Sequence, residues 1–463
     1  MKKRIYLLVE ILKREIDARI YFASVASELN YSVVIGHKGV LWERLKYLRP
    51  GVVIFKSIGP RNTKMMNSLK NYGHQIAAYD EEMFINYDIE DAVERRIYPK
   101  SMKELDYFFC WGDDDRNAIG NRYPEFKNKI FSTGNPRVDI LKNKKNKVFH
   151  EEAEKIKSKY GKFILFTSSF SKINENLPQE RIGHVFNMVA MGKDIYSREL
   201  EVARNWRSLL QNDLEHYIKF IQEFDTNFPD KKLIVRPHPA ENEKFWFGLT
   251  KNLKNVITVS DNMSTNAWIL ASDLLIGHND TTIIEASYLN KPVLNFVPCR
   301  DYPSVEYKVL KKFTKTIRSL TELNEVIKNE NFNDYVIGDT GNLELSLYLT
   351  NFKQDQCSVK NIIEVIKSRE SEFDKFNSID LRTGPVFLLF YEIKAFFKKL
   401  LKKIYFFKRV DARVERRKNQ KFGKGISYNE FKNKCKKIFN GKSSSSYNIK
   451  KIFPHIFKIE SKK

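Results

Sequence analysis

The sequence predicts an α/β protein with two doubly wound parallel sheets, and two observations support this fold class. Short, continuous apolar runs alternate with longer segments of helical periodicity between residues 4 and 296. This pattern is typical of parallel strands that helices cover on both faces. A lysine-rich stretch at 142–160 interrupts the alternation once. We therefore expect two Rossmann-like domains that face a cleft, with a boundary near 145–162.

Each strand is predicted from its own apolar run, and the runs fall into two sets on either side of the boundary. The first set comprises residues 4–9, 32–36, 52–55, 75–79, 107–110 and 129–132. The second set comprises residues 163–168, 232–236, 255–259, 273–277 and 292–296. Amphipathic stretches such as 14–29 and 88–105 predict the helices between them, and 170–215 reads as helix and loop without a strand.

Composition restricts the class of protein. Of the 463 residues 42% are hydrophobic, which excludes a chain that is disordered throughout. The net charge is +24, but residues 391–463 alone hold 23 basic and five acidic residues. The remainder is close to neutral and has no RRM, KH or zinc-finger signature, so we expect no nucleic-acid partner. The four cysteines form no CxxC pair, which argues against a disulfide framework and fits a reducing cytosol.

The C-terminal segment differs from the body. From Leu389 to Phe407, apolar residues fall on one helical face and most lysines lie opposite. This pattern predicts a basic amphipathic helix suited to an anionic membrane surface. Two alternatives stay open, namely a helix that docks on the body and a nucleic-acid-binding tail. Beyond residue 412 the chain is polar, and we expect it to be poorly ordered. No run of 18 apolar residues predicts a membrane-spanning helix.

Ligands of doubly wound sheets bind at the carboxyl ends of the strands, so polar residues there are the first candidates. The sequence Arg236-Pro-His238-Pro follows one strand, and its prolines hold the backbone extended. His238 could bind phosphate or act as an acid or base, and Arg236 offers a fork suited to phosphate. The alternative is a proline-stiffened turn with a surface histidine.

A second candidate is Gly-His278-Asn279-Asp280-Thr281-Thr282, which follows the strand 273–277 and opens a helix. Hydroxyl and backbone N–H groups at a helix N-terminus favour an anion. Glu285, one turn further on, could accept hydrogen bonds from a ribose. The alternative is simple N-capping by Asp280 or Thr281, which is compatible with ligand binding.

Further candidates lie after other strands. Thr167 and Ser168, followed by Ser169, end the first strand of the second set and could donate hydroxyls to a phosphate. Lys38, Asn135 and Arg137 are expected to face the cleft or the acceptor.

Acidic runs follow two strands of the first set. Adjacent carboxylates such as Asp80, Glu81 and Glu82 raise one another's pKa, so one of them could be a general base or nucleophile. The alternative is an acidic helix cap. The run at 113–115 we interpret as a helix cap rather than a metal site. Neither a P-loop nor a GxGxxG fingerprint is present, and we predict no metal ligands.

Together these pieces resemble the bacterial surface carbohydrate biosynthesis proteins, which look like GT-B-fold glycosyltransferases. The matching segments are LLVEILKREIDARI at 7–20, PGVVIFKS at 50–57, AYDEE at 78–82, FFCWG at 108–112, STGNPRVDI at 132–140, RPHP at 236–239 and LLIGHNDTTIIEASYLNKPVL at 274–294. The second half is also similar to capsule and teichoic-acid polymer enzymes and, in its His-Pro element, to Kdo transferases.

The resemblance implies roles for these residues and regions. His238 and Arg236 would hold the donor phosphate, with Thr281 and Thr282 at the helix end, and Glu285 would take the ribose. Residues 1–150 would be the acceptor domain and residues 160–350 the nucleotide-sugar domain. Residues 351–385 would form a helical connection that crosses back to the first domain, and residues 386–463 a partly disordered tail.

The predicted function is a metal-independent glycosyltransferase of capsule or lipopolysaccharide synthesis that needs no cofactor. It would use a nucleotide sugar, such as a CMP-Kdo-like donor, and a glycan or lipid-linked acceptor. We expect a cytoplasmic protein held at the inner face of the membrane by its tail. Glu81 is the favoured base or nucleophile. The alternatives are a CDP-polyol phosphotransferase of teichoic-acid type, a nucleotide-sugar 2-epimerase and a basic nucleic-acid-binding protein.

Overall fold

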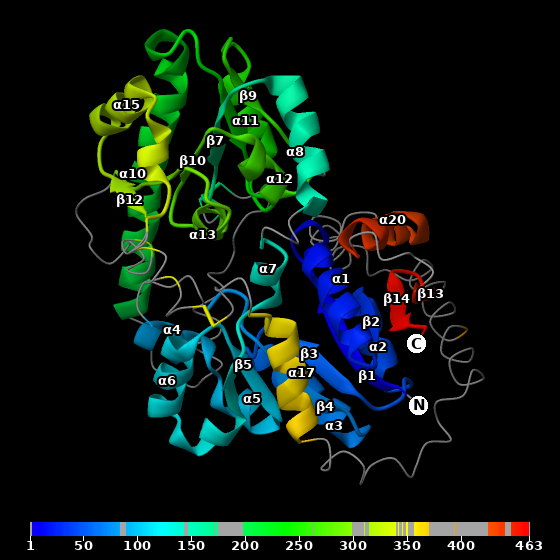
Figure 1. The fold of residues 1–463 in the computed structure, drawn as a ribbon. Helices are drawn as coiled ribbons and strands as arrows, with labels where there is room; N and C mark the ends of the chain where they lie inside the picture. The colour runs from blue at the N-terminus through cyan, green and yellow to red at the C-terminus, as the bar shows by residue number, and fades with distance from the viewer. Residues whose placement is uncertain are drawn as a thin grey trace. The chain divides into compact units, whose positions relative to one another are not determined.

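The protein is described by a computed structural model, and Figure 1 shows its ribbon. The structure describes residues 2–83, 89–142, 147–171, 173–174, 198–261, 263–298, 310, 314–338, 341, 345, 349–350, 356–369, 393, 425–439 and 446–462. Two compact units make up the chain, and each is considered by itself. The first comprises residues 1–79, 100–109 and 357–463, and the second comprises residues 80–99 and 110–356.

An eight-stranded sheet has the strand order β13-β14-β2-β1-β3-β4-β5-β6. Its strands are β1 (Lys3–Val9), β2 (Tyr31–His37), β3 (Val52–Phe55), β4 (Gln75–Ala78), β5 (Tyr107–Cys110), β6 (Ile130–Ser132), β13 (Tyr447–Phe453) and β14 (Ile456–Ser461). The pairs β1–β2, β1–β3, β3–β4 and β4–β5 are parallel, and β1 to β5 consist almost entirely of buried residues. All six strands predicted for the first set are thereby confirmed.

The C-terminal strands were not predicted. Strand β14 pairs antiparallel with β2, and β13 pairs antiparallel with β14. Helix α20 (Tyr428–Ile438) packs beside α1 (Leu12–Glu28). It also contacts β14, because the ring of Phe431 in α20 stacks on that of Phe457 in β14 at 4.1 Å. We expected the chain beyond residue 412 to be poorly ordered, but residues 425–439 and 446–462 form regular structure. Their core-facing residues are buried, whereas the intervening lysines give the segment its polar composition.

A six-stranded parallel sheet has the strand order β12-β11-β10-β7-β8-β9. Its strands are β7 (Ile164–Thr167), β8 (Leu233–Arg236), β9 (Val256–Thr258), β10 (Leu274–Gly277), β11 (Val293–Phe296) and β12 (Lys315–Ile317). The five strands predicted for the second set are confirmed, and the short β12 was missed. The chain adds β8 and β9 on one side of β7 and β10 to β12 on the other. The point where the strand order reverses is therefore between β7 and β10, which is where ligands bind such sheets.

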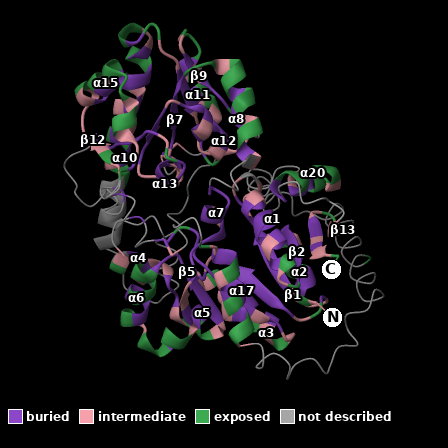
Figure 2. Cartoon of the chain, in the orientation of Figure 1, coloured by how far each residue is buried: buried purple, intermediate pink, exposed green. Residues whose placement is uncertain are grey.

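Helices connect these strands, and their inner faces are buried while their outer faces are exposed (Figure 2). Besides α1 and α20, they are α2 (Lys38–Leu45), α3 (Thr63–Asn71), α4 (Ile89–Arg96), α5 (Pro99–Glu104), α6 (Asp113–Arg122), α7 (Pro136–Asp139), α8 (Lys147–Tyr160), α10 (Arg198–Asn227), α11 (Glu243–Thr250), α12 (Thr265–Ala271), α13 (Thr281–Tyr288), α15 (Leu320–Asn329) and α17 (Ser358–Ser368). The helical stretch predicted at 88–105 is two helices, because Pro99 cannot continue α4 and instead begins α5.

The core of the six-stranded sheet is rich in aromatic side chains. The ring of Tyr217, from α10, stacks on Phe166 of β7 at 4.6 Å, and Trp246 of α11 meets Phe166 edge-on at 5.7 Å. All three side chains are fully buried. This packing holds α10 and α11 against the sheet, and so fixes the loops that follow its strands.

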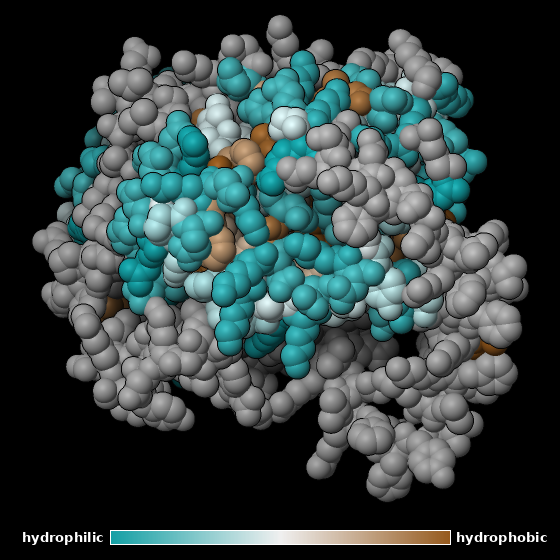
Figure 3. All heavy atoms as spheres, turned by 90° about the horizontal axis from the view of Figure 1, so that it is seen from below, coloured by the Kyte–Doolittle hydropathy of each residue, from teal (hydrophilic) through white to brown (hydrophobic). Residues whose placement is uncertain are grey.

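Among the residues that the structure describes, no helix is both long and apolar enough to cross a bilayer. The amphipathic helix predicted at 389–407 lies outside the described residues except for the single position 393. On the face shown in Figure 3, the described side chains are mostly hydrophilic, with small hydrophobic patches between them.

Candidate functional site

The loops after β7, β8 and β10 meet at the carboxyl edge of the six-stranded sheet, where the sequence placed most donor-binding candidates. β7 lies between β10 and β8 in the sheet, so the three loops are neighbours. Hydrogen bonds join them in pairs, as described below. The structure thus brings Thr167, Ser168, His238 and the residues around His278 into one site.

Glu241 clamps the loop after β8 to the loop after β7. Its side chain is fully buried and accepts hydrogen bonds from Ser168 Oγ (2.8 Å), Trp246 Nε1 (2.8 Å) and the backbone N–H of Phe170 (2.7 Å). Ser168 Oγ in turn accepts from the backbone N–H of His238 (3.0 Å). Burial raises the pKa of Glu241 to about 7, although the hydrogen bond from Ser168 acts in the opposite direction.

His238 is partly exposed and is held in one tautomer. Its Nδ1 accepts a hydrogen bond from the backbone N–H of Ala240 at 3.2 Å, so the ring hydrogen lies on Nε2 in the neutral imidazole. Nε2 is then a donor of the kind that a phosphate oxygen accepts. Arg236 is placed differently from our expectation. Its guanidinium donates to the carbonyl of Met263 (2.7 Å) and lies 3.7 Å from Asp261, toward the loop after β9.

The N-terminus of α13 is capped by its own carboxylate. Asp280 Oδ1 accepts from the backbone N–H of Thr282 at 2.8 Å and also from its hydroxyl. Thr167 Oγ1 lies 2.8 Å from Thr282 Oγ1 and donates to Asp280 Oδ2 at 3.3 Å. Desolvation raises the pKa of Asp280 to about 6. The capping alternative is therefore confirmed, and a phosphate at this helix end would have to compete with an acidic side chain at neutral pH.

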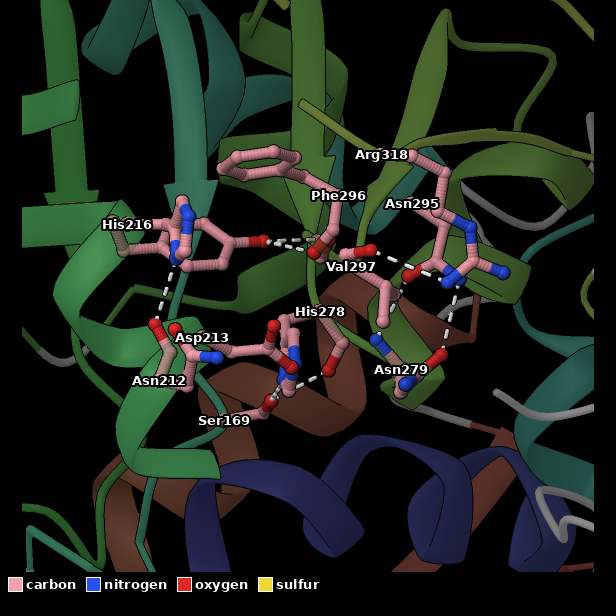
Figure 4. Close-up of polar contacts among 12 residues, drawn as sticks. Ser169, Asn212, Asp213, His216, His278, Asn279, Asn295, Phe296, Val297 and Arg318 are labelled. Carbon is pink, nitrogen blue, oxygen red and sulfur yellow. Dashed lines mark hydrogen bonds and ion pairs between the residues drawn. The ribbon is translucent and has the colours of Figure 1, made fainter. Parts of the chain in front are cut away.

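His278 and Asn279 lie in the site, but both side chains are engaged by the protein (Figure 4). His278 is buried, and its two ring nitrogens contact Asp213 and Ser169. Asn279 has a left-handed backbone (φ 46°), and its amide N–H donates to Asn295 Oδ1 at 2.9 Å. Asn295 Nδ2 donates back to Asn279 Oδ1 at 3.0 Å. These contacts fix the loop that leads into α13.

Glu285, predicted to bind a ribose, forms an ion pair with Arg137 within the second unit. Arg137 Nη2 lies 2.6 Å from Glu285 Oε1, and both side chains are largely buried. Asn135 is buried and caps α7, because its Oδ1 accepts from the backbone N–H of Arg137 at 3.0 Å. A small pocket is lined by Arg137, Glu285 and Thr281, with Trp111, Val138, Leu141, Ile284, Tyr288 and Leu349.

The match to a protein-family model decides what kind of protein this is. Residues 65–335 match the family described as CDP-glycerol:poly(glycerophosphate) glycerophosphotransferase. The chain belongs to this family. The match covers more than half of the chain and includes every loop of the site described above. It confirms that the protein is a transferase in the surface-polymer class, and it favours the polyol-phosphate alternative over the glycosyltransferase that we predicted first.

Comparison with solved structures concerns the fold. The chain is similar to the UDP-GlcNAc 2-epimerase of Methanocaldococcus jannaschii, with 14% identity over 80% of this chain and 100% of that chain, and a TM-score of 0.51. It also matches the wall teichoic acid polymerase TagF, with 12% identity over 80% of this chain and 89% of that chain, and a TM-score of 0.48. The epimerase likeness confirms the GT-B-like α/β fold. No curated protein sequence gives a significant match.

Two carboxylates of the acidic run Asp80–Glu82, which we predicted to be catalytic, are paired with an arginine. Asp80 is buried and lies 2.7 Å from Arg96 Nη2, while the exposed Glu82 lies 3.3 Å from the same atom. Desolvation raises the pKa of Asp80, and the Arg96 charge opposes that shift. Glu81 is buried as well. Of the second acidic run, Asp115 caps α6 as predicted, by accepting from the backbone N–H of Gly112 at 2.9 Å.

Lys38 lies in the first unit, at the carboxyl edge of the eight-stranded sheet. It begins α2 and is 3.9 Å from Glu10, which follows β1. Lys56, after β3, lies 3.0 Å from Glu10 and 3.3 Å from the buried Glu15 of α1. This ion cluster spans the β1–β3 junction, where the strand order of that sheet reverses. Of its members, the sequence analysis named Lys38 alone.

Sequence reasoning also missed Glu241 and Asp213, which hold the donor-site loops. The sequence pattern around Asp213 could have identified it as a buried, partnered residue. It lies on the apolar stripe of α10, three residues after Leu210 and four before Tyr217, and an acid on such a stripe needs a buried partner. Glu241 has no comparable signal, since it follows His238 in a short loop of mixed polarity.

Proposed function

We propose that this protein transfers a polyol phosphate, such as glycerol phosphate, from a CDP-linked donor to a hydroxyl of a surface polymer. The observation that carries the proposal is the family match over residues 65–335, which contain the whole site at the carboxyl edge of the six-stranded sheet. In this reaction the acceptor oxygen forms a bond to the phosphorus that carries the polyol. The bond from that phosphorus to the bridging oxygen breaks, and CMP departs with the electron pair. The proton of the acceptor hydroxyl goes to a base, for which Glu81 is our prediction.

The geometry supports a role for His238 on the donor diphosphate. Its neutral imidazole presents a hydrogen on Nε2, and the clamp through Ser168 and Glu241 holds the loop that carries it. Preorganised donors of this kind stabilise developing charge without reorganising during the reaction. Glu285 stays the predicted ribose ligand, and Glu81 stays the predicted base.

Two other readings remain distinct from this proposal. A glycosyltransferase with a CMP-activated sugar would use the same nucleotide and is still a prediction of the sequence. The likeness to a 2-epimerase concerns the fold alone. Association with a lipid-linked acceptor at the inner membrane surface, through the basic segment after residue 386, also remains a prediction.

The test is a ligand-induced thermal shift with CDP-glycerol, CMP and UDP-GlcNAc. We expect stabilisation by CDP-glycerol and CMP and none by UDP-GlcNAc. His238→Ala should lose most of the CDP-glycerol shift, because the Nε2 donor is removed. His150→Ala is the matched control, since His150 is exposed on α8 of the same unit.

Turnover is then measured as CMP release with a poly(glycerophosphate) acceptor, with ³¹P NMR used to identify the phosphodiester product. Stabilisation by UDP-GlcNAc alone would contradict the proposal. Turnover with a CMP-linked sugar but not with CDP-glycerol would replace it with the glycosyltransferase reading.

A further inference from the structure

Ser169, His278 and Asp213 form one continuous hydrogen-bonded array (Figure 4). His278 Nε2 lies 2.9 Å from Asp213 Oδ2, and His278 Nδ1 lies 2.9 Å from Ser169 Oγ. The histidine and aspartate side chains are almost completely buried, at 2% and 0% exposure, whereas Ser169 is partly exposed. The array therefore runs from a buried carboxylate to a partly exposed serine.

The hydrogen-bond partners indicate where the hydrogens lie. Ser169 Oγ also donates to the backbone carbonyl of His278 at 2.5 Å, which uses the single hydroxyl hydrogen. Nδ1 must then donate to Ser169 Oγ. His278 Nε2 and Asp213 Oδ2 share a second hydrogen. The array therefore fixes the Ser169 hydroxyl through the hydrogen on Nδ1.

The imidazole is fixed on every side. The Phe170 ring stacks on it at 4.7 Å, and the Tyr217 ring meets it edge-on at 5.8 Å. The Tyr217 hydroxyl donates to the carbonyl of Gly277 at 3.1 Å, directly before the histidine. The charged groups that face the ring are Asp213 from α10 and Asp280 from its own loop. With the ring held so firmly, Ser169 is the member of the array that can turn toward a ligand.

The location of the Ser169–His278 bond points to the donor. Ser169 follows β7 and His278 follows β10, so this contact bridges the two strands between which the strand order reverses. The carboxyl ends of these strands line the crevice where ligands of doubly wound sheets bind. His238, with its Nε2 hydrogen, belongs to the adjoining loop, which the Ser168–Glu241 contact ties to that of Ser169.

We propose that Ser169 is a catalytic residue that donates a hydrogen bond to the donor's departing phosphate, and that His278 and Asp213 are positioning residues acting through it. The inference rests on the proposed function. As the bond from the polyol phosphorus to the bridging oxygen breaks, the electron pair stays on that oxygen, which leaves with CMP. The acceptor hydroxyl gives its proton to the base, and Ser169 keeps its own hydrogen. The Ser169 hydroxyl turns from the His278 carbonyl to a phosphate oxygen, while Nδ1–H continues to donate to Oγ and strengthens the new bond.

The kinetic test compares variants in the CMP-release assay with CDP-glycerol. Ser169→Ala should lower kcat by about 10²–10³-fold, the effect of removing one preorganised donor, with KM nearly unchanged. Ser169→Thr should retain most activity, because the hydroxyl remains. The matched control is Ser171→Ala, two residues further along the same loop. Equal rates for Ser169→Ala and Ser171→Ala, or an increase in KM alone, would overturn the proposal.

Asp213→Asn separates a positioning role from a purely structural one. Without the carboxylate the imidazole loses the partner that fixes it, so kcat should fall with KM nearly unchanged, and adding Ser169→Ala should lower kcat little further. Additive losses in the double variant would overturn the positioning role. Melting temperatures of all variants identify any loss caused by misfolding.

A donor-independent readout tells failure of this inference from failure of the proposed function. In ¹⁵N-histidine-labelled protein, His278 should give a downfield Nδ1–H signal that is absent in His278→Gln. Inorganic pyrophosphate should shift the Nδ1–H signal in the wild type but not in Ser169→Ala. Absence of the Nδ1–H signal, or no response to pyrophosphate, would overturn the inference. A clear response without CDP-glycerol turnover would refute the proposed donor and leave the role of Ser169 standing.

Discussion

Glu241 should make the stability of the second unit depend on pH. Its carboxyl group is fully buried, and burial raises its pKa from 4.5 to about 7. A raised pKa means that the folded state binds the proton more tightly than the unfolded state. The protonated carboxyl therefore stabilises the fold below pH 4.5, and this stabilisation is lost as the pH rises through 7. Glu241→Gln keeps the shape of the side chain and removes the titration.

The size of the effect follows from the two pKa values. Each pKa unit corresponds to about 1.4 kcal/mol, so the free energy of unfolding of the wild type should fall by about 2–3 kcal/mol between pH 5 and pH 8 because of this group. Other groups titrate in the same range, including Asp280 and Asp115. Their contribution is common to both proteins and largely cancels in the difference.

The assay is differential scanning calorimetry of wild type and Glu241→Gln at pH 5 and pH 8. The difference in melting temperature should shift by about 5–10 °C in favour of the variant at the higher pH. Glu215→Gln, on the exposed face of α10, is the control and should show no such shift. If the melting temperatures of wild type and Glu241→Gln differ by the same amount at pH 5 and pH 8, the reasoning is refuted, because the buried carboxyl would then have no raised pKa.

Two further stability predictions concern contacts near the site. Tyr217→Phe should lower the free energy of unfolding by about 1–2 kcal/mol, because the single hydroxyl hydrogen is shared between the carbonyls of Gly277 and Phe296. Urea denaturation should show no change in slope. Arg96→Ala should lower it by about 2–3 kcal/mol, less than for a fully buried pair because 30% of the Arg96 side chain is exposed. Adding Asp80→Asn to Arg96→Ala should recover much of the lost free energy of unfolding. If the losses of the two single variants simply add in the double variant, the pairing would be contradicted.

The strands could be predicted because each is an uninterrupted apolar run between polar segments. Runs such as 274–277 need no partner to be recognised, since burial on both faces of a parallel strand favours consecutive apolar residues. Strand β14 was missed because lysine and glutamate interrupt it. Buried and partly exposed residues alternate only from Phe457 to Glu460, within a segment whose composition resembles a disordered tail.

The site was predictable in position but not in detail. The loops around His238 and His278 were found because they follow predicted strands. The direction of each side chain depended on partners elsewhere in the sequence. Arg236, which we expected to bind a phosphate, donates to the Met263 carbonyl. One ring nitrogen of His278 is hydrogen-bonded to Asp213. Sequence spacing carries no information about such distant pairs.

The pairing of β14 with β2 has a consequence for synthesis of the chain. Strand β2 emerges from the ribosome long before β14, because most of the described residues lie between them. Until then the backbone N–H and C=O groups on that edge of β2 stay open to other chains, and such edges promote aggregation. A nascent or truncated protein that lacks residues 446–462 therefore exposes the edge of β2 to pairing with other chains.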